Sequence, residues 1–352
     1  MFHLRKFPVM DINKALGCLY GQLIGDALGN PYELVGKSED VKALMKKDCE
    51  ADGFLPIRGH ITDDSQMALT IAESVCRNGF YDQADVACGY VRWAKTLPAD
   101  IGNATKSALT IDVRLPPSWK TALDEDFKKC VLRHVLRNVK QYNQDSLSNG
   151  CLMRVSPLAI ACASLTPDQM RTVVQSDTML THTNDVCAES VIAYSTAIRA
   201  LLYGRSPKEA YDEALSFCRN ETVGNLLRAA AEKAVPVKAR DADVFGDTAA
   251  QGYVGVALQG AFYELLNAAS FKDGLVETIG RGGDTDTNGC IAGALLGARF
   301  GVEMIPLRWK RTIHSAPPTI PSLELPTDIE DIAQRLICAI DPTKQKQHSL
   351  SN

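Results

Sequence analysis

The sequence lacks long hydrophobic runs, basic stretches and paired cysteine motifs, and each absence argues against a class of protein. No segment approaches the roughly 18 uninterrupted apolar residues of a membrane span, and no signal-peptide-like apolar run follows the basic start MFHLRKFPVMDINK. A net charge of -4 offers little attraction for nucleic acid. The eleven cysteines are scattered without a C-x-x-C pair, which indicates reduced thiols and a cytoplasmic protein.

The pattern that is present is the helical one. Apolar residues recur three and four apart through residues 12–28, 67–75, 186–202, 253–266 and 290–300. Asn, Asp, Gly, Pro and Ser cluster between these segments, and no convincing linker divides the chain. We therefore predict an all-α fold, with an N-terminal arm over residues 1–10, a single domain over 11–341 and a polar, disordered tail over 342–352.

Two of these segments carry glycine at every fourth position. The first stripe is Gly17, Gly21, Gly25 and Gly29, and the second is Gly289, Gly293, Gly297 and Gly301. A glycine inside a helix costs about 1 kcal/mol relative to alanine, so close approach of two backbones is the expected compensation. Asp26 argues against a membrane helix pair. The spacing predicts that the two helices cross near the centre of the domain, although coincidental spacing is the alternative.

Two oxygen-rich clusters each stand directly before a predicted helix, at residues 60–65 (HITDDS) and 282–288 (GGDTDTN). Either cluster alone could simply cap its helix. Together they offer more oxygens than capping needs, and oxygen ligands without nearby cysteine suit Mg²⁺ or Mn²⁺ rather than zinc. If the clusters meet, four carboxylates and two hydroxyls could hold two divalent cations.

Several motifs in order resemble the ADP-ribosylglycohydrolase family: GCLYGQLIGDALGNPYELVG, ITDDSQM, DIGNAT, SNGCLMRVSPLAI, LTHTND, GYVGVALQGAFYEL and GGDTDTNGCIAGALLGARFG. The resemblance spans roughly residues 14 to 310. It implies a compact, orthogonal multi-helix domain with a central dinuclear site for Mg²⁺ or Mn²⁺. The metal ligands that it implies are Thr62, Asp63, Asp64, Asp284, Asp286 and Thr287.

The same resemblance implies the catalytic and substrate-binding residues. The catalytic set is Asp100, Glu33, Asp64 and Asp284, in which Asp100 would lie beside the scissile bond and Glu33 on a movable loop over the metals. The substrate-binding set is Gly102, Asn103, Ser148, Asn149, Gly150, Met153, His182 and Tyr253. For several of these residues a purely structural role is the alternative: a simple turn at residues 100–103, helix capping at residues 148–149, and burial in the core for His182 and Tyr253. The SNGCLMR segment by itself predicts a helix N-terminus that could bind phosphate oxygens.

The predicted activity is hydrolysis of the N-glycosidic bond of ADP-ribosylarginine on a modified protein. Metal ions would neutralise the diphosphate and lower the pKa of an attacking water, while Asp100 or Glu33 accepts its proton. Arginine is favoured over serine because acidic neighbours match a guanidinium. The alternatives are a hydrolase of serine-linked or small-molecule ADP-ribose, and an immunity protein whose residues 1–10 block an ADP-ribosylating toxin.

Overall fold

The computed structural model describes residues 9–33, 35, 38–55, 60–116, 121–234, 238–239, 242–243, 251–316 and 328–339. Residues 1–8 of the predicted arm and the whole predicted tail lie outside the described residues. The hypothesis that the arm blocks a toxin therefore stays a prediction, as do the domain boundaries.

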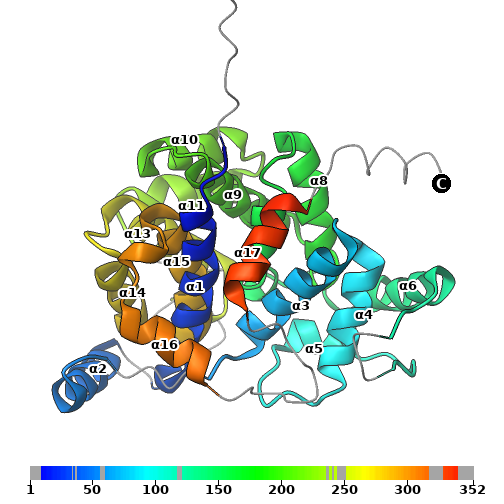
Figure 1. Cartoon of the computed structure of the whole chain (residues 1–352), viewed down its shortest axis with the longest axis horizontal. Helices are drawn as coiled ribbons and strands as arrows, with labels where there is room; N and C mark the ends of the chain where they lie inside the picture. Colours follow the sequence, from blue (N-terminus) through cyan, green and yellow to red (C-terminus); the bar gives the residue numbers. More distant parts are fainter. Residues whose placement is uncertain are drawn as a thin grey trace, which may run out of the picture.

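Helices make up nearly all of the regular structure of the described chain (Figure 1). They are α1 (Ile12–Gly29), η1 (Asn30–Tyr32), α2 (Ser38–Asp52), α3 (Asp63–Asn78), α4 (Gln83–Ala94), α5 (Asn103–Leu109), α6 (Glu125–Tyr142), η2 (Asn149–Cys151), α7 (Ser156–Ala161), α8 (Pro167–Thr178), α9 (Asp185–Leu202), α10 (Pro207–Phe217), α11 (Glu221–Ala230), α13 (Val254–Asn267), α14 (Phe271–Gly280), α15 (Thr285–Phe300), η3 (Val302–Met304), α16 (Leu307–Ser315) and α17 (Ile329–Cys338). Within the described ranges, the only strands are β1 (Lys238–Ala239) and β2 (Ala242–Asp243), which pair antiparallel. The prediction of a helical fold is confirmed for this part of the chain.

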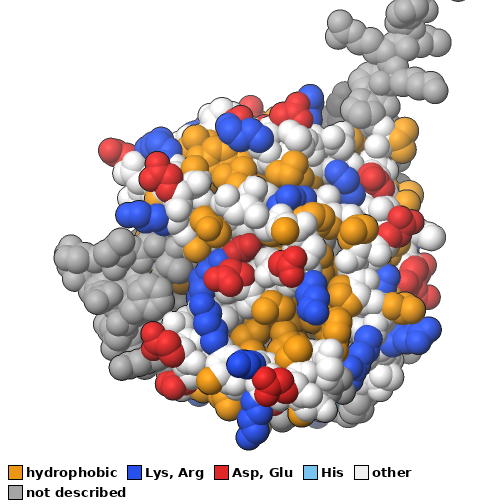
Figure 2. All heavy atoms as spheres, turned by 90° about the vertical axis from the view of Figure 1, so that its left-hand side faces the viewer, with side chains coloured by type: hydrophobic (Ala, Val, Ile, Leu, Met, Phe, Trp, Pro, Cys, Tyr) orange, Lys and Arg blue, Asp and Glu red, His pale blue; other side chains and the backbone are white. Residues whose placement is uncertain are grey.

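None of the described helices combines the length and apolar character that crossing a membrane requires. Charges of both signs are interspersed with hydrophobic side chains on the face shown in Figure 2. All eleven cysteines lie among the described residues, and none of them forms a disulfide.

The two glycine-striped helices, α1 and α15, pack directly against each other at the centre of the fold (Figure 1). A Cβ atom on Gly21 would clash with the backbone of Gly293, and one on Gly25 with the backbone of Gly289. The prediction that these helices meet is confirmed, and the coincidence alternative is wrong. They pair in antiparallel order along their length rather than at one crossing point, because every glycine of one stripe faces the other helix.

The antiparallel pairing decides where the polar clusters lie. It places the C-terminal end of α1 beside the N-terminal end of α15, where the Thr285 hydroxyl donates to the Gly29 carbonyl at 2.9 Å. The helices α9, α13 and α14 pack on α15, and α7, α16 and α17 pack on α1. Since α3 also begins near this end of α1, residues from three distant parts of the sequence share one region.

Candidate active site

Asp26 organises the first oxygen cluster. This carboxylate is fully buried in α1 and accepts hydrogen bonds from the Thr62 amide at 3.0 and 3.1 Å and from the Ser65 amide at 3.1 Å. The Thr62 hydroxyl lies 2.9 Å from Asp26 Oδ1. The sequence-based site did not include Asp26. Its signal was present, since it is the one carboxylate inside an apolar, glycine-rich helix.

Helix capping does not explain either oxygen cluster. Thr62 occupies the N-cap position of α3 without a side-chain cap hydrogen bond, and its hydroxyl lies 2.7 Å from Asp64 Oδ2 instead. Asp284 occupies the N-cap position of α15, also without a side-chain cap bond. Its Oδ2 accepts a hydrogen bond from Asn149 Nδ2 at 2.7 Å. The capping alternative is therefore wrong for both N-cap side chains.

The loop before α15 brings its carboxylates to Glu33, which follows η1. One carboxylate oxygen each from Glu33, Asp284 and Asp286 lies within 4.8 Å of the other two. The loop reaches this position through Gly282 and Gly283, whose φ angles of 77° and 80° are strained for residues with a side chain. The Gly-Gly pair is thus a requirement of the acidic cluster.

Burial and mutual repulsion raise the pKa values of Glu33, Asp63, Asp64 and Asp286. Desolvation is the largest cause, and neighbouring carboxylates add to it. The pKa of Asp63 is raised to about 8, that of Glu33 to about 7 and that of Asp26 to about 6. The pKa values of Asp64 and Asp286 are raised well above their ordinary range. A cluster of this kind is stable in its ionised form only with positive charge beside it.

The donor chemistry of the cluster fits divalent cations. The two oxygen-rich clusters, which contain Asp63 and Asp284, supply carboxylate and hydroxyl oxygens. These are the ligands that Mg²⁺ and Mn²⁺ prefer. Asp64 Oδ1 and Asn288 Oδ1 are buried and have no hydrogen-bond partner among the described residues. A buried carboxylate oxygen that accepts no hydrogen bond can coordinate a cation instead.

Residues 148–150, which we call the SNG segment, join the acidic cluster to other predicted substrate contacts. Ser148 and Tyr253 form an isolated antiparallel bridge, and the Asn149 amide donates to the Gly252 carbonyl at 2.9 Å. Ser148 Oγ lies 2.7 Å from His182 Nε2. With the Asn149 bond to Asp284, these contacts bring Ser148, Asn149, His182 and Tyr253 to the edge of the carboxylate cluster.

SNGCLMR is followed by a helix N-terminus, as expected, because α7 begins at Ser156 with Val155 as its N-cap. Within the segment, residues 149–151 form η2, a three-residue 3-10 turn. The amides of Leu152 and Met153 turn back to the Asn149 carbonyl, at 2.7 and 3.1 Å. Ser148 makes no side-chain cap bond there, so capping does not account for it either.

The DIGNAT segment lies on the other side of the cluster. Asp100 is exposed, and desolvation and the charge of Asp284 raise its pKa. The Gly102 amide donates to the Asp63 carboxylate. Gly102 is the N-cap residue of α5, which starts at Asn103. Asp100 is thus a solvent-facing carboxylate at the rim of a mostly buried acidic group.

Four of the predicted substrate contacts are buried: Asn149, Gly150, Met153 and His182. Met153 is 4% exposed, and its carbonyl accepts from Gln22 Nε2 at 3.1 Å and Cys290 Sγ at 3.3 Å. His182 is fully buried, as its alternative reading supposed, but its ring is bonded to Ser148 rather than packed only among apolar groups. Gly150 lies close to the same ring, because a Cβ there would be 3.6 Å from His182 Cε1.

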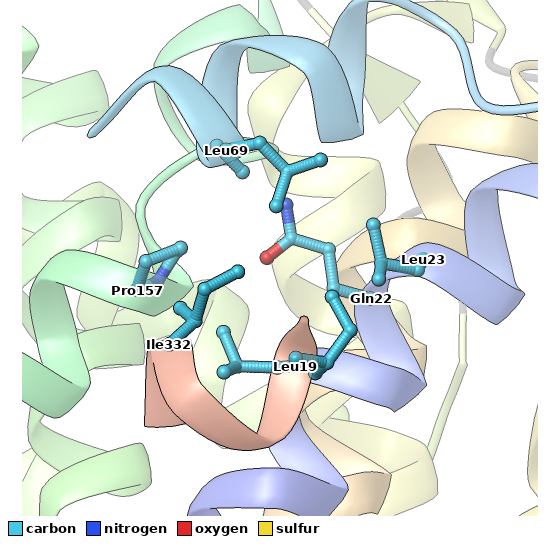
Figure 3. A pocket seen from close by; sticks show the side chains of 8 residues that line it. Leu19, Gln22, Leu23, Leu69, Pro157 and Ile332 are labelled. Atoms are coloured by element: carbon cyan, nitrogen blue, oxygen red, sulfur yellow. The ribbon is translucent and has the colours of Figure 1, made fainter. Parts of the chain in front are cut away.

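A separate small pocket lies between α1, α3, α7 and α17 (Figure 3). Its lining is mostly apolar, with Leu19, Leu23, Leu69 and Ile332 around one amide, Gln22. That amide is already hydrogen-bonded to the Met153 carbonyl and the Ser156 hydroxyl. The pocket contains no carboxylate, and we regard it as a packing gap.

The fold and the cluster define an all-helical protein with a carboxylate-lined site suited to divalent cations. The chain belongs to the ADP-ribosylglycohydrolase family, whose model matches residues 9–346. The resemblance found in the sequence motifs is thereby confirmed. Membership makes the chain a hydrolase of ADP-ribosyl glycosidic bonds.

Named relatives cover most of the chain. ADP-ribosyl-[dinitrogen reductase] glycohydrolase of Rhodospirillum rubrum is 26% identical over 299 residues, which cover 84% of this chain and 89% of the relative. ADP-ribosylarginine hydrolase Tri1 of Pseudomonas putida (strain GB-1) is 27% identical over 311 residues, covering 86% and 74%. A solved structure described as an ADP-ribosylglycohydrolase-related protein complex matches with a TM-score of 0.67 at 22% identity, over 94% of this chain and 99% of that one, which supports the fold.

Proposed function

We propose that this chain removes ADP-ribose from arginine side chains of modified proteins by hydrolysing the N-glycosidic bond with the help of two divalent cations, Mg²⁺ or Mn²⁺. The observation that carries the proposal is the convergence of the two acidic clusters at one end of the α1/α15 pair. The residues that would hold the cations are Thr62, Asp63, Asp64, Asp284, Asp286 and Thr287. Glu33 lies close enough to two of them to share in binding.

The cations would solve an electrostatic problem of the site. A diphosphate next to so many carboxylates is repelled unless positive charge intervenes. When bound, such cations supply that charge and polarise ribose hydroxyls and water. The groups around Ser148, Asn149 and Gly150 would hold the diphosphate, and Tyr253, which is partly exposed, would contact the adenine end.

Glu33 and Asp100 are the candidates for proton acceptor. Both have raised pKa values, and the pKa of Glu33, about 7, is suited to proton transfer near neutral pH. Asp100 is exposed at the rim, where an incoming guanidinium could form a charge-assisted hydrogen bond with it. This is why we favour an arginine linkage, and the name of the Pseudomonas putida relative supports the same choice. Serine-linked or small-molecule ADP-ribose is the alternative substrate.

A substrate panel tests the proposal. Arginine-modified and serine-modified proteins are incubated with the wild type and with Asp63→Ala, with Mg²⁺, Mn²⁺ or chelator, and released ADP-ribose is measured. Asp212→Asn, on the exposed surface of α10, is the matched control for loss of a carboxylate. We expect metal-dependent release from the arginine substrate that Asp63→Ala abolishes and Asp212→Asn retains. Release of ADP-ribose from the serine substrate alone would show that the serine linkage is the substrate. Release that is unchanged by chelator would overturn the proposed metal sites.

A further inference from the structure

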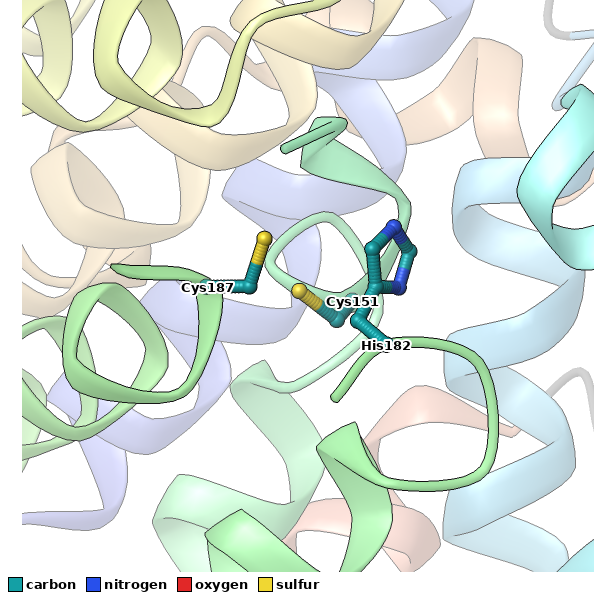
Figure 4. A group of neighbouring side chains, drawn as sticks. All are labelled: Cys151, His182 and Cys187. Atoms are coloured by element: carbon teal, nitrogen blue, oxygen red, sulfur yellow. The ribbon is translucent and has the colours of Figure 1, made fainter. Parts of the chain in front are cut away.

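A second group of potential metal ligands, Cys151, His182 and Cys187, lies behind the SNG segment (Figure 4). All three side chains are buried, and their ligand atoms lie within 4.8 Å of one another. The imidazole is nevertheless already satisfied: Nδ1 lies 2.8 Å from Thr181 Oγ1 and Nε2 lies 2.7 Å from Ser148 Oγ. Because neither ring nitrogen is left over for a metal, these hydrogen bonds are the informative feature of the group.

The hydrogen bonds continue to a fully buried arginine. Arg154 Nε donates to Asp177 Oδ2 at 3.1 Å and its Nη2 to the Asp177 carbonyl at 2.9 Å. Arg154 Nη1 donates to the Gly150 carbonyl at 3.1 Å and to Thr181 Oγ1 at 2.8 Å. One guanidinium therefore fixes both the SNG segment and the loop that carries His182.

The Asp177 end of this network is also fixed. Asp177 is fully buried, and its Oδ1 accepts from the Tyr90 hydroxyl at 3.0 Å. The Arg154 guanidinium lies over the Tyr90 ring, 4.7 Å from its centroid. Asn143 Nδ2 holds the Thr181 carbonyl at 2.9 Å and the Ala104 carbonyl of α5 at 2.7 Å. The guanidinium thus has one orientation in which its hydrogen bonds are made.

The arginine can only donate, and this favours one order of donors and acceptors along the network. Thr181 Oγ1 accepts from Arg154, so its own hydrogen is free to be donated to His182 Nδ1. A neutral imidazole that accepts at Nδ1 carries its hydrogen on Nε2, and this nitrogen then donates to Ser148 Oγ. The hydroxyl hydrogen of Ser148 takes no part in the bond to His182. Without a ligand it can point to Ser146 Oγ, 3.3 Å away.

We propose that Arg154, Asp177 and Thr181 are positioning residues that set the tautomer of His182 and so turn the Ser148 hydroxyl into a hydrogen-bond donor for an anionic oxygen of the bound diphosphate. This inference rests on the proposed function for the identity of the ligand. Arg154 acts through its neighbours, because it is fully buried and its donors face Asp177, Gly150 and Thr181.

Thr181→Val tests the relay, since it removes the hydroxyl while nearly conserving the volume of the side chain, and Thr181→Ser is the control that keeps the hydroxyl. We expect the Kd for free ADP-ribose, measured by calorimetry in the presence of Mg²⁺, to rise about tenfold in the valine variant, the effect of one lost hydrogen bond. The serine variant should bind like the wild type. For the modified-protein substrate KM should rise while kcat stays unchanged.

Nitrogen-15 NMR of the His182 ring reads the tautomer without relying on activity. The wild type should show hydrogen on Nε2, and Thr181→Val should lose this exclusive preference. Hydrogen on Nδ1 in the wild type would overturn the relay even if no variant folded, and so would an unchanged Kd in a folded Thr181→Val protein. A wild type that shows the Nε2 tautomer but binds no ADP-ribose would instead refute the proposed function.

Discussion

The acidic cluster around Asp63 and the network around Arg154 are both buried and polar, yet their charges are balanced in opposite ways. The cluster gathers carboxylates whose pKa values are raised by burial and by one another. In the network, the Arg154 guanidinium faces the Asp177 carboxylate, and hydroxyl and carbonyl groups accept its other hydrogen bonds. The bond between Asn149 and Asp284 joins the SNG segment, which Arg154 also holds, to the cluster.

The difference separates binding chemistry from scaffolding. A set of like charges that the protein does not neutralise is maintained at the cost of stability, and such an arrangement is typical of a site that binds cations. A paired and fully hydrogen-bonded charge holds segments of chain in place but has little left to offer a ligand. We therefore assign chemistry to the cluster and positioning to the network.

The largest expected effect separates the two groups by kinetics. Asp284→Asn should lower kcat for ADP-ribose release by about 100-fold or more, because it removes the charge of a proposed metal ligand. Ser148→Ala should raise KM about tenfold and leave kcat within about twofold, the cost of one substrate hydrogen bond. Steady-state kinetics at saturating Mg²⁺ measure both. Equal losses of kcat in the two variants would contradict the division of roles.

Stability should separate the two groups with opposite signs. Asp177→Asn should lower the free energy of unfolding by about 3–5 kcal/mol, because it leaves the Arg154 charge buried without its partner. Asp63→Asn, measured with chelator at pH 8, should leave stability unchanged or raise it, because it removes a repelled charge. Urea unfolding of both variants gives the two values. A stabilised Asp177→Asn protein would show that the pair contributes nothing to folding.

The packing of α1 on α15, which supports both the acidic cluster and the Arg154 network, can be disrupted at the glycine stripe of α1. Gly21→Ala should lower the free energy of unfolding by about 1–3 kcal/mol, because its Cβ would meet the Gly293 backbone at less than 3.0 Å. Gly224→Ala is the matched control inside α11, where the added Cβ would meet only the Arg228 side chain, at 3.4 Å. It should be neutral or up to about 1 kcal/mol stabilising. Equal thermal shifts in the two variants would remove close packing as the reason for the stripe.

The smallest expected effect is the pH dependence of the metal-free protein. The pKa values of Asp63, Glu33 and Asp26 are raised in the folded state, to about 8, 7 and 6. Their protonated forms favour folding, so stability is fully present at low pH and is lost as pH rises through these values. Between pH 7 and pH 8 we expect a loss on the order of 1 kcal/mol, which saturating Mg²⁺ or Mn²⁺ cancels. A free energy of unfolding that does not change with pH in this range, measured with chelator, would contradict the raised pKa values of these groups.

The sequence predicted the parts of the site that repeat a local pattern. Oxygen-rich residues crowd into two short segments, so a candidate metal-binding set could be proposed without knowing the fold, and the glycine spacing predicted the contact between α1 and α15. Asp26, Arg154 and Asp177 were missed. Their partners lie far along the chain: Thr62 is 36 residues from Asp26, and Asp177 is 23 residues from Arg154.

Helix type and the identity of the oxygen clusters are local properties, because backbone propensity and residue spacing act over a few turns. The sequence by itself determined both of these properties. Which carboxylates stand together, how far each pKa is raised, and which hydrogen the His182 ring carries depend on desolvation and on partners from other segments. Only tertiary packing decided these: α1 on α15 joins the end of one helix to the start of another 256 residues away, and Arg154 bonds to the loop that carries His182.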